Sequence, residues 1–322
     1  MSGRELVDVV VRRVEPAGER VVLLELGPAD GATSLPPFTA GAHVDLHVGG
    51  FVRQYSLVGS DDASDRYVVG VLRERAGRGG SAAVHDTVRP GDRLRVSAPR
   101  STFALDLDAE HSVLVGGGIG LTPLVAMAER LHREGRSFEL HVYTPSATTL
   151  PLGAHLASRP WRDRVVTHFS AYGDTFRGNA PAVVPRPRPG LALYVCGPLG
   201  MVASATACAS ALGWPRSDVH VEHFERSSPV ETSGDAFTVV AASDGRRMDV
   251  GEDETIAQVL QRHGYDVVLS CEQGICGSCL TGVVDGLPDH RDEVQTPDEH
   301  AANTQLNVCC SRASTPTLTL AV

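Results

Sequence analysis

The chain has 322 residues, enough for two or three domains that each bury a core. Its 29 Lys+Arg and 39 Asp+Glu give a formal net charge of −10, which disfavours nucleic acid as a partner. The N-terminus does not resemble a signal peptide, and the uncharged stretch 112–128 contains four glycines and a proline, a poor membrane span. We therefore expect a cytoplasmic, monomeric protein without nucleic-acid or membrane partners.

Residues 1–105 predict an antiparallel β-barrel. Short stretches rich in Val and Leu are separated by Gly and Pro turns, a pattern typical of a small barrel. The expected strands span 5–14, 20–26, 43–48, 66–73 and 93–98.

Two motifs within this barrel suit a flavin. Arg53-Gln54-Tyr55-Ser56 offers a guanidinium to a phosphate, an aromatic face to an isoalloxazine ring and a hydroxyl to a ring nitrogen. Arg78-Gly79-Gly80-Ser81 precedes a helical stretch, whose N-terminus supplies N–H donors for the same phosphate. Each motif also has a plain structural interpretation, namely an edge arginine beside a packed tyrosine and an ordinary helix N-cap.

Residues 106–226 alternate strands with helices, which predicts a parallel sheet covered on both faces. The expected elements are strands 112–115, 138–143, 165–169 and 191–196 and a helix at 124–133. The turn Gly117-Gly118-Ile119-Gly120-Leu121-Thr122 follows the first strand and lets a pyrophosphate rest on a helix N-terminus. Tight strand-to-helix connections use the same residues.

The choice between NADH and NADPH is predicted from the end of the second expected strand of this region, 138–143. A 2′-phosphate calls for arginines close by, and the next arginine is Arg159, so we expect NADH and not NADPH. Phe224 closes this region in a final stretch, 221–225, where its ring either shields the flavin, meets the nicotinamide or is an ordinary core residue.

The last quarter of the chain predicts a β-grasp ferredoxin domain. Residues 227–235 form an expected polar linker, and 236–322 the domain, with a strand at 237–242, a helix at 255–263 and a strand at 318–322. From residue 235 onward there are 5 Arg and 14 Asp+Glu, so 5 − 14 = −9 of the net charge lies here. Such an acidic surface either serves solubility or steers a basic partner.

Cys271, Cys276 and Cys279 follow a C-x4-C-x2-C spacing, and Cys309-Cys310 comes near the C-terminus. This is the ligand spacing of a plant-type [2Fe–2S] ferredoxin. A structural zinc site usually pairs two knuckles, a disulfide framework needs an oxidising compartment, and a Rieske centre needs two histidines, so these alternatives fit less well. The spacing leaves Cys309 and Cys310 both open as the fourth ligand.

The combined motifs resemble known families. The flavin motifs and the barrel resemble the flavin domain of the ferredoxin–NADP⁺ reductase superfamily, in which an element like Cys196-Gly197-Pro198 sits beside the nicotinamide. A small buried residue at a strand end is the structural alternative for Cys196. The order barrel, nicotinamide domain, C-terminal ferredoxin, with Asp289-His290-Arg291-Asp292 after the cluster loop, resembles the phthalate dioxygenase reductase family, which includes vanillate demethylase reductases. The resemblance covers essentially the whole chain.

The resemblance implies FMN and not FAD, a choice that the residues alone leave open, and it favours Cys309 as the fourth cluster ligand. It also implies an NADH-dependent reductase that takes a hydride onto FMN and passes single electrons through the [2Fe–2S] cluster to a separate terminal oxygenase. That oxygenase would be a Rieske-type aromatic oxygenase or demethylase, docked transiently on the acidic ferredoxin domain. The alternatives are a reductase partner of a cytochrome P450, a flavin-dependent NADH oxidase or reductase of a small molecule, and a redox-sensing module.

Overall fold

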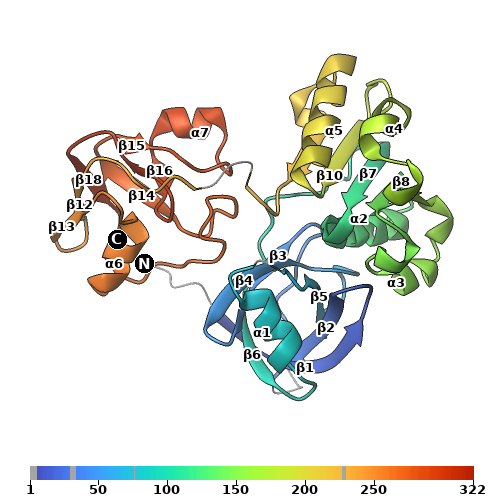
Figure 1. The fold of residues 1–322 in the computed structure, drawn as a ribbon, viewed down its shortest axis with the longest axis horizontal. Coiled ribbons are helices and arrows are strands. Elements are labelled where there is room, and N and C mark those ends of the chain that lie inside the picture. Colours follow the sequence, from blue (N-terminus) through green and yellow to red (C-terminus); the bar gives the residue numbers. More distant parts are fainter. Residues whose placement is uncertain (1–5, 30–33, 76, 227–229) are drawn as a thin grey trace. The chain divides into compact units, whose positions relative to one another are not determined.

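The computed structural model describes residues 6–29, 34–75, 77–226 and 230–322, so the expected strand start at residue 5 and residues 227–229 of the expected linker lie outside the described residues. The chain divides into two compact units, Leu6–Phe224 and Glu225–Val322 (Figure 1). Among the described residues, no helix combines the length and the apolar character needed to cross a membrane.

The first unit begins with a six-stranded antiparallel sheet in the order β4-β3-β6-β1-β2-β5. Its strands are β1 (Leu6–Pro16), β2 (Val21–Pro28), β3 (His43–Val48), β4 (Phe51–Ser56), β5 (Tyr67–Leu72) and β6 (Arg93–Ser97). A bridge between Leu57 and Val69 joins the end of β4 to β5, so the sheet nearly closes on itself around fully buried residues such as Leu24 and Leu46. This confirms the predicted barrel, against which α1 (Gly80–Thr87) packs.

The same unit continues as a five-stranded sheet in the order β11-β10-β7-β8-β9, with every pair parallel. The strands are β7 (His111–Gly117), β8 (Ser137–Thr144), β9 (Val165–Phe169), β10 (Leu191–Cys196) and β11 (Val219–Glu222). The principal helices are α2 (Leu121–Arg133), α3 (Gly153–Ala157), α4 (Phe176–Val183) and α5 (Leu199–Leu212).

Alternation along β7 shows why helices cover both faces of this sheet. Leu114 packs in the cluster that contains the buried face of α2, whereas Val113 and Val115 pack in the cluster that contains residues of α4 and α5. Successive strand residues point to opposite faces, and a run that is apolar throughout requires cover on both. The predicted parallel sheet with two helical layers is therefore confirmed.

Helix α2 begins at Leu121, earlier than the expected start at 124. Pro123 falls in its first turn, where the missing N–H would have had no intrahelical partner in any case. The helix consequently begins directly at the end of the glycine turn and not one turn beyond it.

Polar and apolar contacts fix the parallel sheet against the barrel. Asp61, whose side chain is only 2% exposed, pairs with Arg130 at 3.1 Å and also with Arg133, both on α2. A Cβ at Gly70 of β5 would lie 2.8 Å from Cγ2 of Thr122, so the glycine turn lies directly against the barrel. The two halves of Leu6–Phe224 thus hold their cofactor motifs in one body.

The second unit is a mixed sheet in the order β13-β12-β18-β14-β16, with a two-stranded β15–β17 ladder. Strands β12 and β18 run parallel and the other pairs antiparallel. The elements are β12 (Phe237–Ala241), β13 (Arg247–Val250), α6 (Ile256–Arg262), β14 (Leu280–Asp285), β15 (Pro288–Asp289), α7 (Pro297–Ala302), β16 (Gln305–Asn307), β17 (Arg312–Ala313) and β18 (Thr317–Leu320). This confirms a ferredoxin-type domain, of which the sequence had indicated the hairpin that begins at its first strand, its helix α6 and its last strand.

Candidate cofactor sites

Strand β4 carries the predicted Arg-Gln-Tyr-Ser motif beside the start of α1. Arg53 donates to the carbonyl of Arg78 at 3.4 Å and to that of Val52 at 2.7 Å. A Cβ at Gly80 would lie 2.6 Å from Cγ of Arg53, so glycine at this position leaves room for the aliphatic part of the Arg53 side chain. The fold therefore brings the two predicted flavin motifs together.

The first turn of α1 fits a phosphate. Gly79 at its N-cap has φ 86°, and no side chain in the described residues caps its N–H groups. Ser81 does not cap the helix, because its Oγ accepts a hydrogen bond from the Glu74 N–H at 3.1 Å. The positive end of the helix dipole and the adjacent Arg53 are features that favour an anion, as the sequence predicted.

Tyr55 lies on the same face of β4 as Arg53, whereas Gln54 lies on the other, since strand residues alternate. The Tyr55 ring is half-buried against the barrel core, and burial raises the pKa of its hydroxyl to about 12. Ser56 is buried at the strand end. Arg53 and Tyr55 are thus arranged for one ligand with a phosphate and an aromatic ring.

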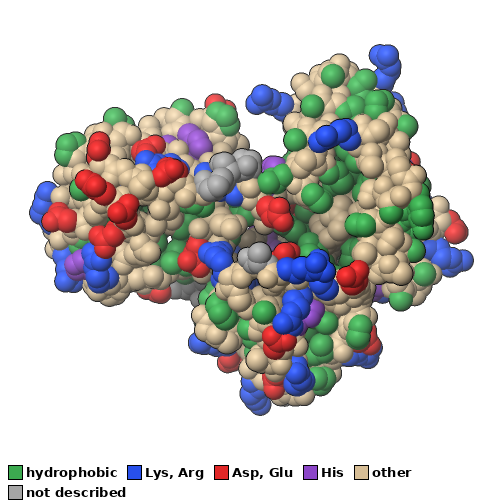
Figure 2. Space-filling view, viewed as in Figure 1, with side chains coloured by type: hydrophobic (Ala, Val, Ile, Leu, Met, Phe, Trp, Pro, Cys, Tyr) green, Lys and Arg blue, Asp and Glu red, His purple; other side chains and the backbone are tan. Residues whose placement is uncertain are grey.

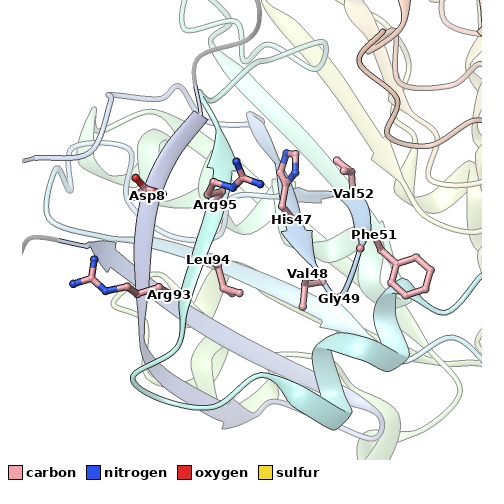
Figure 3. A pocket seen from close by; sticks show the side chains of 10 residues that line it. Asp8, His47, Val48, Gly49, Phe51, Val52, Arg93, Leu94 and Arg95 are labelled. Carbon is pink, nitrogen blue, oxygen red and sulfur yellow. The ribbon is translucent and has the colours of Figure 1, made fainter. Parts of the chain in front are cut away.

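An open pocket of about 530 Å³ lies on the barrel in the area of Figure 3. Cross-strand pairing places Asp8, Arg95, His47 and Val52 in one row across four strands. Burial and the nearby Arg95 both lower the pKa of His47. Arg53 does not line this pocket, but Phe51 does, and the Arg53 guanidinium lies 5.3 Å from the centroid of the Phe51 ring, so the pocket adjoins the predicted phosphate site.

Two glycine turns meet at the carboxyl ends of β7 and β10. A Cβ at Gly120 would lie 2.4 Å from the carbonyl oxygen of Cys196, and one at Gly197 would lie 2.9 Å from Cα of Gly117. No side chain can be placed at these positions without moving the backbone. The predicted pyrophosphate turn and the predicted nicotinamide turn are therefore in direct contact.

The remaining residues of these turns have defined positions. Gly118 has φ 53°, in the left-handed region. The Thr122 hydroxyl donates to the carbonyl of Ile119 at 2.9 Å and so stabilises the turn itself. Pro198 is the N-cap of α5, and its Cδ would lie 2.6 Å from a Cβ at Gly117. Phe224 follows β11 and packs, half-buried, against the core cluster that includes Cys196.

Glu222 is a residue to which sequence reasoning gave no role. Its carboxylate is 8% exposed at the end of β11 and accepts from the Cys196 thiol at 3.9 Å. Burial raises the pKa of Glu222 to about 8, and burial also raises the pKa of the Cys196 thiol. The sequence could have drawn attention to Glu222 through its position at the end of the final stretch, 221–225, which follows the strand that ends in Cys196-Gly197-Pro198. A carboxyl group held neutral there places a proton beside the predicted nicotinamide site.

The four predicted cluster cysteines form two pairs in the second unit. Cys271 interacts directly with Cys276, and a hydrogen bond from the Cys271 thiol lowers the pKa of Cys276 to about 6. Cys309 interacts with Cys279, an interaction that raises the pKa of Cys309. All seven cysteines of the chain lie in the described residues and none forms a disulfide.

The loop backbone is shaped around these sulfurs. The N–H groups of Gln273 and Ser278 point at the sulfurs of Cys271 and Cys276, at 3.3 and 3.4 Å. Gly274 and Gly277 have φ 70° and 65°, values that favour glycine. Four thiols in two pairs, with N–H donors aimed at sulfur, fit a [2Fe–2S] cluster.

Cys310 occupies a different environment from Cys309. Its thiol is directed to the carbonyl of Asn307 at 3.7 Å, and a Cβ at Gly274 would lie 2.6 Å from its sulfur. Cys309 interacts with Cys279 and the Gly274 N–H, and also with the neighbouring Cys310 thiol. The contact with Cys279 distinguishes Cys309 from Cys310, and Cys309 as the fourth ligand stays a prediction.

Comparison with known proteins gives consistent matches over the whole chain. A family model described as a 2Fe-2S iron-sulfur cluster binding domain matches residues 240–314. The vanillate O-demethylase oxidoreductase of Pseudomonas sp. (strain HR199 / DSM 7063) is 40% identical over 316 residues, which cover 98% of this chain and 99% of that protein. The phenoxybenzoate dioxygenase subunit beta of Ectopseudomonas oleovorans is 38% identical, with 98% and 97% covered.

Two solved structures share the fold over 98% of this chain at 34% identity. One is phthalate dioxygenase reductase, described as a modular structure for electron transfer from pyridine nucleotides to [2Fe-2S], with a TM-score of 0.74 and 98% of its chain covered. The other is an intact type IV self-sufficient cytochrome P450 monooxygenase, with a TM-score of 0.86 and 41% of its chain covered. These matches confirm the predicted resemblance: the chain belongs to the phthalate dioxygenase reductase family, the flavin and iron–sulfur oxidoreductases that act as oxygenase reductases.

Proposed function

We propose that this protein is the NADH-dependent reductase of a separate terminal oxygenase of the Rieske type, with FMN and a [2Fe–2S] cluster as resident cofactors. The observation that carries the proposal is the paired arrangement of Cys271 with Cys276 and of Cys279 with Cys309 in a chain that also contains a flavin-type barrel. FMN, when bound, supplies the conversion between a two-electron hydride donor and a one-electron acceptor.

The chain's own residues contribute positioning and charge. The N-terminus of α1, Arg53 and Ser81 hold the FMN phosphate, and Tyr55 and Ser56 contact its ring. Residues 117–122 hold the NADH pyrophosphate. Cys196 and Pro198 frame the nicotinamide, and Phe224 covers the apolar side of the site. Glu222 keeps a proton beside Cys196 below about pH 8, so no fixed negative charge faces the incoming NADH there.

The preference for NADH rests on the surroundings of β8. The next arginine after this strand is Arg159, and its guanidinium already pairs with Glu129 at 3.0 Å and contacts Nδ1 of His155 at 3.0 Å. An arginine engaged in this way is a poor ligand for a 2′-phosphate. We infer a selectivity for NADH over NADPH.

We propose four segments with distinct tasks: the FMN barrel at 1–105, the NAD domain at 106–226, a linker at 227–235 and the ferredoxin domain at 236–322. The last of these has 5 Arg and 13 Asp+Glu, so 5 − 13 = −8 of the net charge lies there, and acidic side chains are exposed on it in Figure 2. An acidic surface steers a basic partner into transient docking, at a rate that falls as salt is added.

The test is an anaerobic titration of the purified protein with NADH, followed by visible absorbance and low-temperature electron paramagnetic resonance. Bleaching of the flavin band together with the rhombic signal of a reduced [2Fe–2S] cluster is expected. The variant Cys271→Ser should keep flavin bleaching and lose the signal. Flavin bleaching without a cluster signal in the wild-type protein would refute electron transfer through the cluster.

A second candidate acceptor is a cytochrome P450, favoured by the full-length structural likeness to the reductase part of a self-sufficient P450. Reduction rates with a purified Rieske oxygenase and with a purified P450, compared across salt concentrations, discriminate between the two. The Rieske proposal requires faster reduction of the Rieske protein, with a rate that falls as ionic strength rises.

A further inference from the structure

Two histidines and one aspartate lie together in the ferredoxin unit, on the segment that follows the cluster loop. Oδ1 of Asp292 is 3.2 Å from Nε2 of His300 and 3.9 Å from Nδ1 of His290, and all three atoms lie within 4.8 Å of one another. Two ligands that are each about 2.1 Å from one tetrahedral ion are separated by roughly 3.4 Å. The three donor atoms therefore lie within reach of one ion, provided that the two imidazole rings, which are stacked with centroids 4.4 Å apart, turn toward it.

The protonation state of His290 follows from Asn303. The Asn303 amide nitrogen donates to the carbonyl of Ala301 at 3.2 Å, which orients its oxygen toward Nε2 of His290 at 3.1 Å. Nε2 therefore carries the hydrogen, and the neutral ring has its lone pair at Nδ1. A second hydrogen bond of this kind is the usual means by which a ligating histidine is oriented.

That lone pair lacks a partner in the described part of the chain, although the His290 side chain is only 9% exposed. It faces Oδ1 of Asp292, another acceptor, whose side chain is fully buried. Two acceptors that face each other in a buried site repel unless a cation lies between them. A metal ion or an extra proton would relieve this repulsion.

Asp292 is held so that one oxygen remains directed at the histidines. Its Oδ2 accepts from the N–H groups of Val294 at 3.3 Å and Gln295 at 2.9 Å, which leaves Oδ1 for the site. His300, on α7, is 29% exposed and gives the site a route to solvent. Water can enter there as a further ligand, as in zinc sites with three protein ligands.

We propose that His290, Asp292 and His300 bind a divalent transition-metal ion of the zinc class, with solvent completing its coordination. Two imidazoles and one carboxylate suit such an ion. The donor set differs from the sulfur ligands of the cluster, so the ion is additional to the two irons. The Glu293 N–H donates to the carbonyl of Gly274 at 2.9 Å, which ties this segment to the cluster loop.

The first test uses the holoprotein, treated with a mild chelator, dialysed and titrated with Zn²⁺. We expect one zinc per chain by elemental analysis, with the iron content unchanged. X-ray absorption at the zinc edge should show nitrogen and oxygen ligands at about 2.0–2.1 Å and no sulfur at about 2.3 Å. Absence of stoichiometric zinc would overturn the proposal and leave a proton as the cation, and a sulfur shell would overturn it by placing zinc on the cysteines.

Variants locate the ion. His300→Gln, at a partly exposed position, should abolish stoichiometric binding while the visible spectrum of the cluster is retained. His263→Gln is the matched control in the same unit, because its ring nitrogen bonds the carbonyl of Val259 at 2.9 Å, and it should bind zinc as the wild-type protein does. Asn303→Gly keeps the left-handed backbone (φ 52°) and removes the amide that orients His290, so affinity should fall about 10- to 100-fold. Unchanged zinc binding in His300→Gln would refute this site.

Discussion

Cys196 and Glu222 face each other across the ends of β10 and β11, with the Cys196 thiol 3.9 Å from a carboxylate oxygen of Glu222. Both side chains are buried, and the backbone of Cys196 touches the glycine turn at Gly120. A titratable group that is buried at such a junction makes both stability and the local charge depend on pH.

Glu222→Gln should remove a pH dependence of stability. The folded-state pKa of about 8 lies above the ordinary value of 4.5, so between these pH values the native protein retains a proton that the unfolded chain has released. The free energy of unfolding therefore falls as pH rises through this window, by up to roughly 1.4 kcal/mol per pH unit. The glutamine of the variant cannot ionise, so the free energy of unfolding of the variant should exceed that of the wild type by about 2–4 kcal/mol at pH 8.

The measurement is denaturant unfolding at several pH values, followed by tryptophan fluorescence, because Trp161 and Trp214 are the only tryptophans and both lie in Leu6–Phe224. Glu19→Gln, at an exposed turn, is the control and should leave the pH dependence unchanged. A Glu222→Gln profile parallel to that of the wild type would show that the carboxyl group is not buried as described.

Gly120→Ala should damage the nucleotide site through sterics alone. The new Cβ would lie 2.4 Å from the carbonyl oxygen of Cys196, which is backbone and cannot rotate away. We expect a loss of about 1–3 kcal/mol in the free energy of unfolding and a raised KM for NADH. Gly200→Ala is the matched control in α5, because its Cβ would meet only an Arg177 nitrogen at 3.9 Å and alanine favours a helix. Equal stability of the two variants would contradict the close approach of the turns.

The fold could be predicted from the sequence where the pattern is local. The period of the apolar residues indicated the barrel and the parallel sheet, and the spacing of Cys271, Cys276 and Cys279 indicated the cluster, because these signals lie within one element or one loop. Helices α4 and α5 gave weaker local signals: α4 contains Pro181, and α5 is rich in small residues. Their positions are determined by packing on β7 and β10.

The parts of the sites that could not be predicted depend on contacts between distant segments. Glu222 is an ordinary glutamate in the sequence and becomes unusual only because the parallel register places it beside Cys196. His290 and His300 are ten positions apart, on either side of a loop, and no spacing rule joins them. Tertiary contact and burial, which a motif does not encode, give these residues their chemistry.

The two adjacent cysteines should behave differently when replaced. Cys309→Ser should lose the [2Fe–2S] signal or most of its iron, because Cys309 interacts with Cys279 and the Gly274 N–H. Cys310→Ala should retain the cluster, since its thiol is directed to the Asn307 carbonyl, and should cost only about 1 kcal/mol for the small cavity. Iron content and electron paramagnetic resonance of both variants show which cysteine is the fourth ligand. Loss of the cluster in Cys310→Ala alone would identify Cys310, and not Cys309, as that ligand.

Arg312 fixes the residues that precede the ferredoxin sheet. Its side chain is 2% exposed and donates to five backbone carbonyls, those of Thr232, Glu254, Gly234, Asp235 and Gly251, at 2.7–3.2 Å. Three of these carbonyls belong to the expected linker, 227–235, so part of that stretch is held against the domain. Its guanidinium also lies 5.1 Å from the ring centroid of Phe237.

Arg312→Met should therefore destabilise the ferredoxin unit by about 3–5 kcal/mol, because it leaves several buried carbonyls without a donor. Cluster absorbance during denaturation is the appropriate readout, since this unit contains no tryptophan. Arg247→Gln, at an exposed position of β13, is the control and should change stability by less than about 0.5 kcal/mol. If Arg312→Met lost its cluster at the same denaturant concentration as the control, the five hydrogen bonds would contribute nothing net, and the segment 231–235 would have to be held by other contacts.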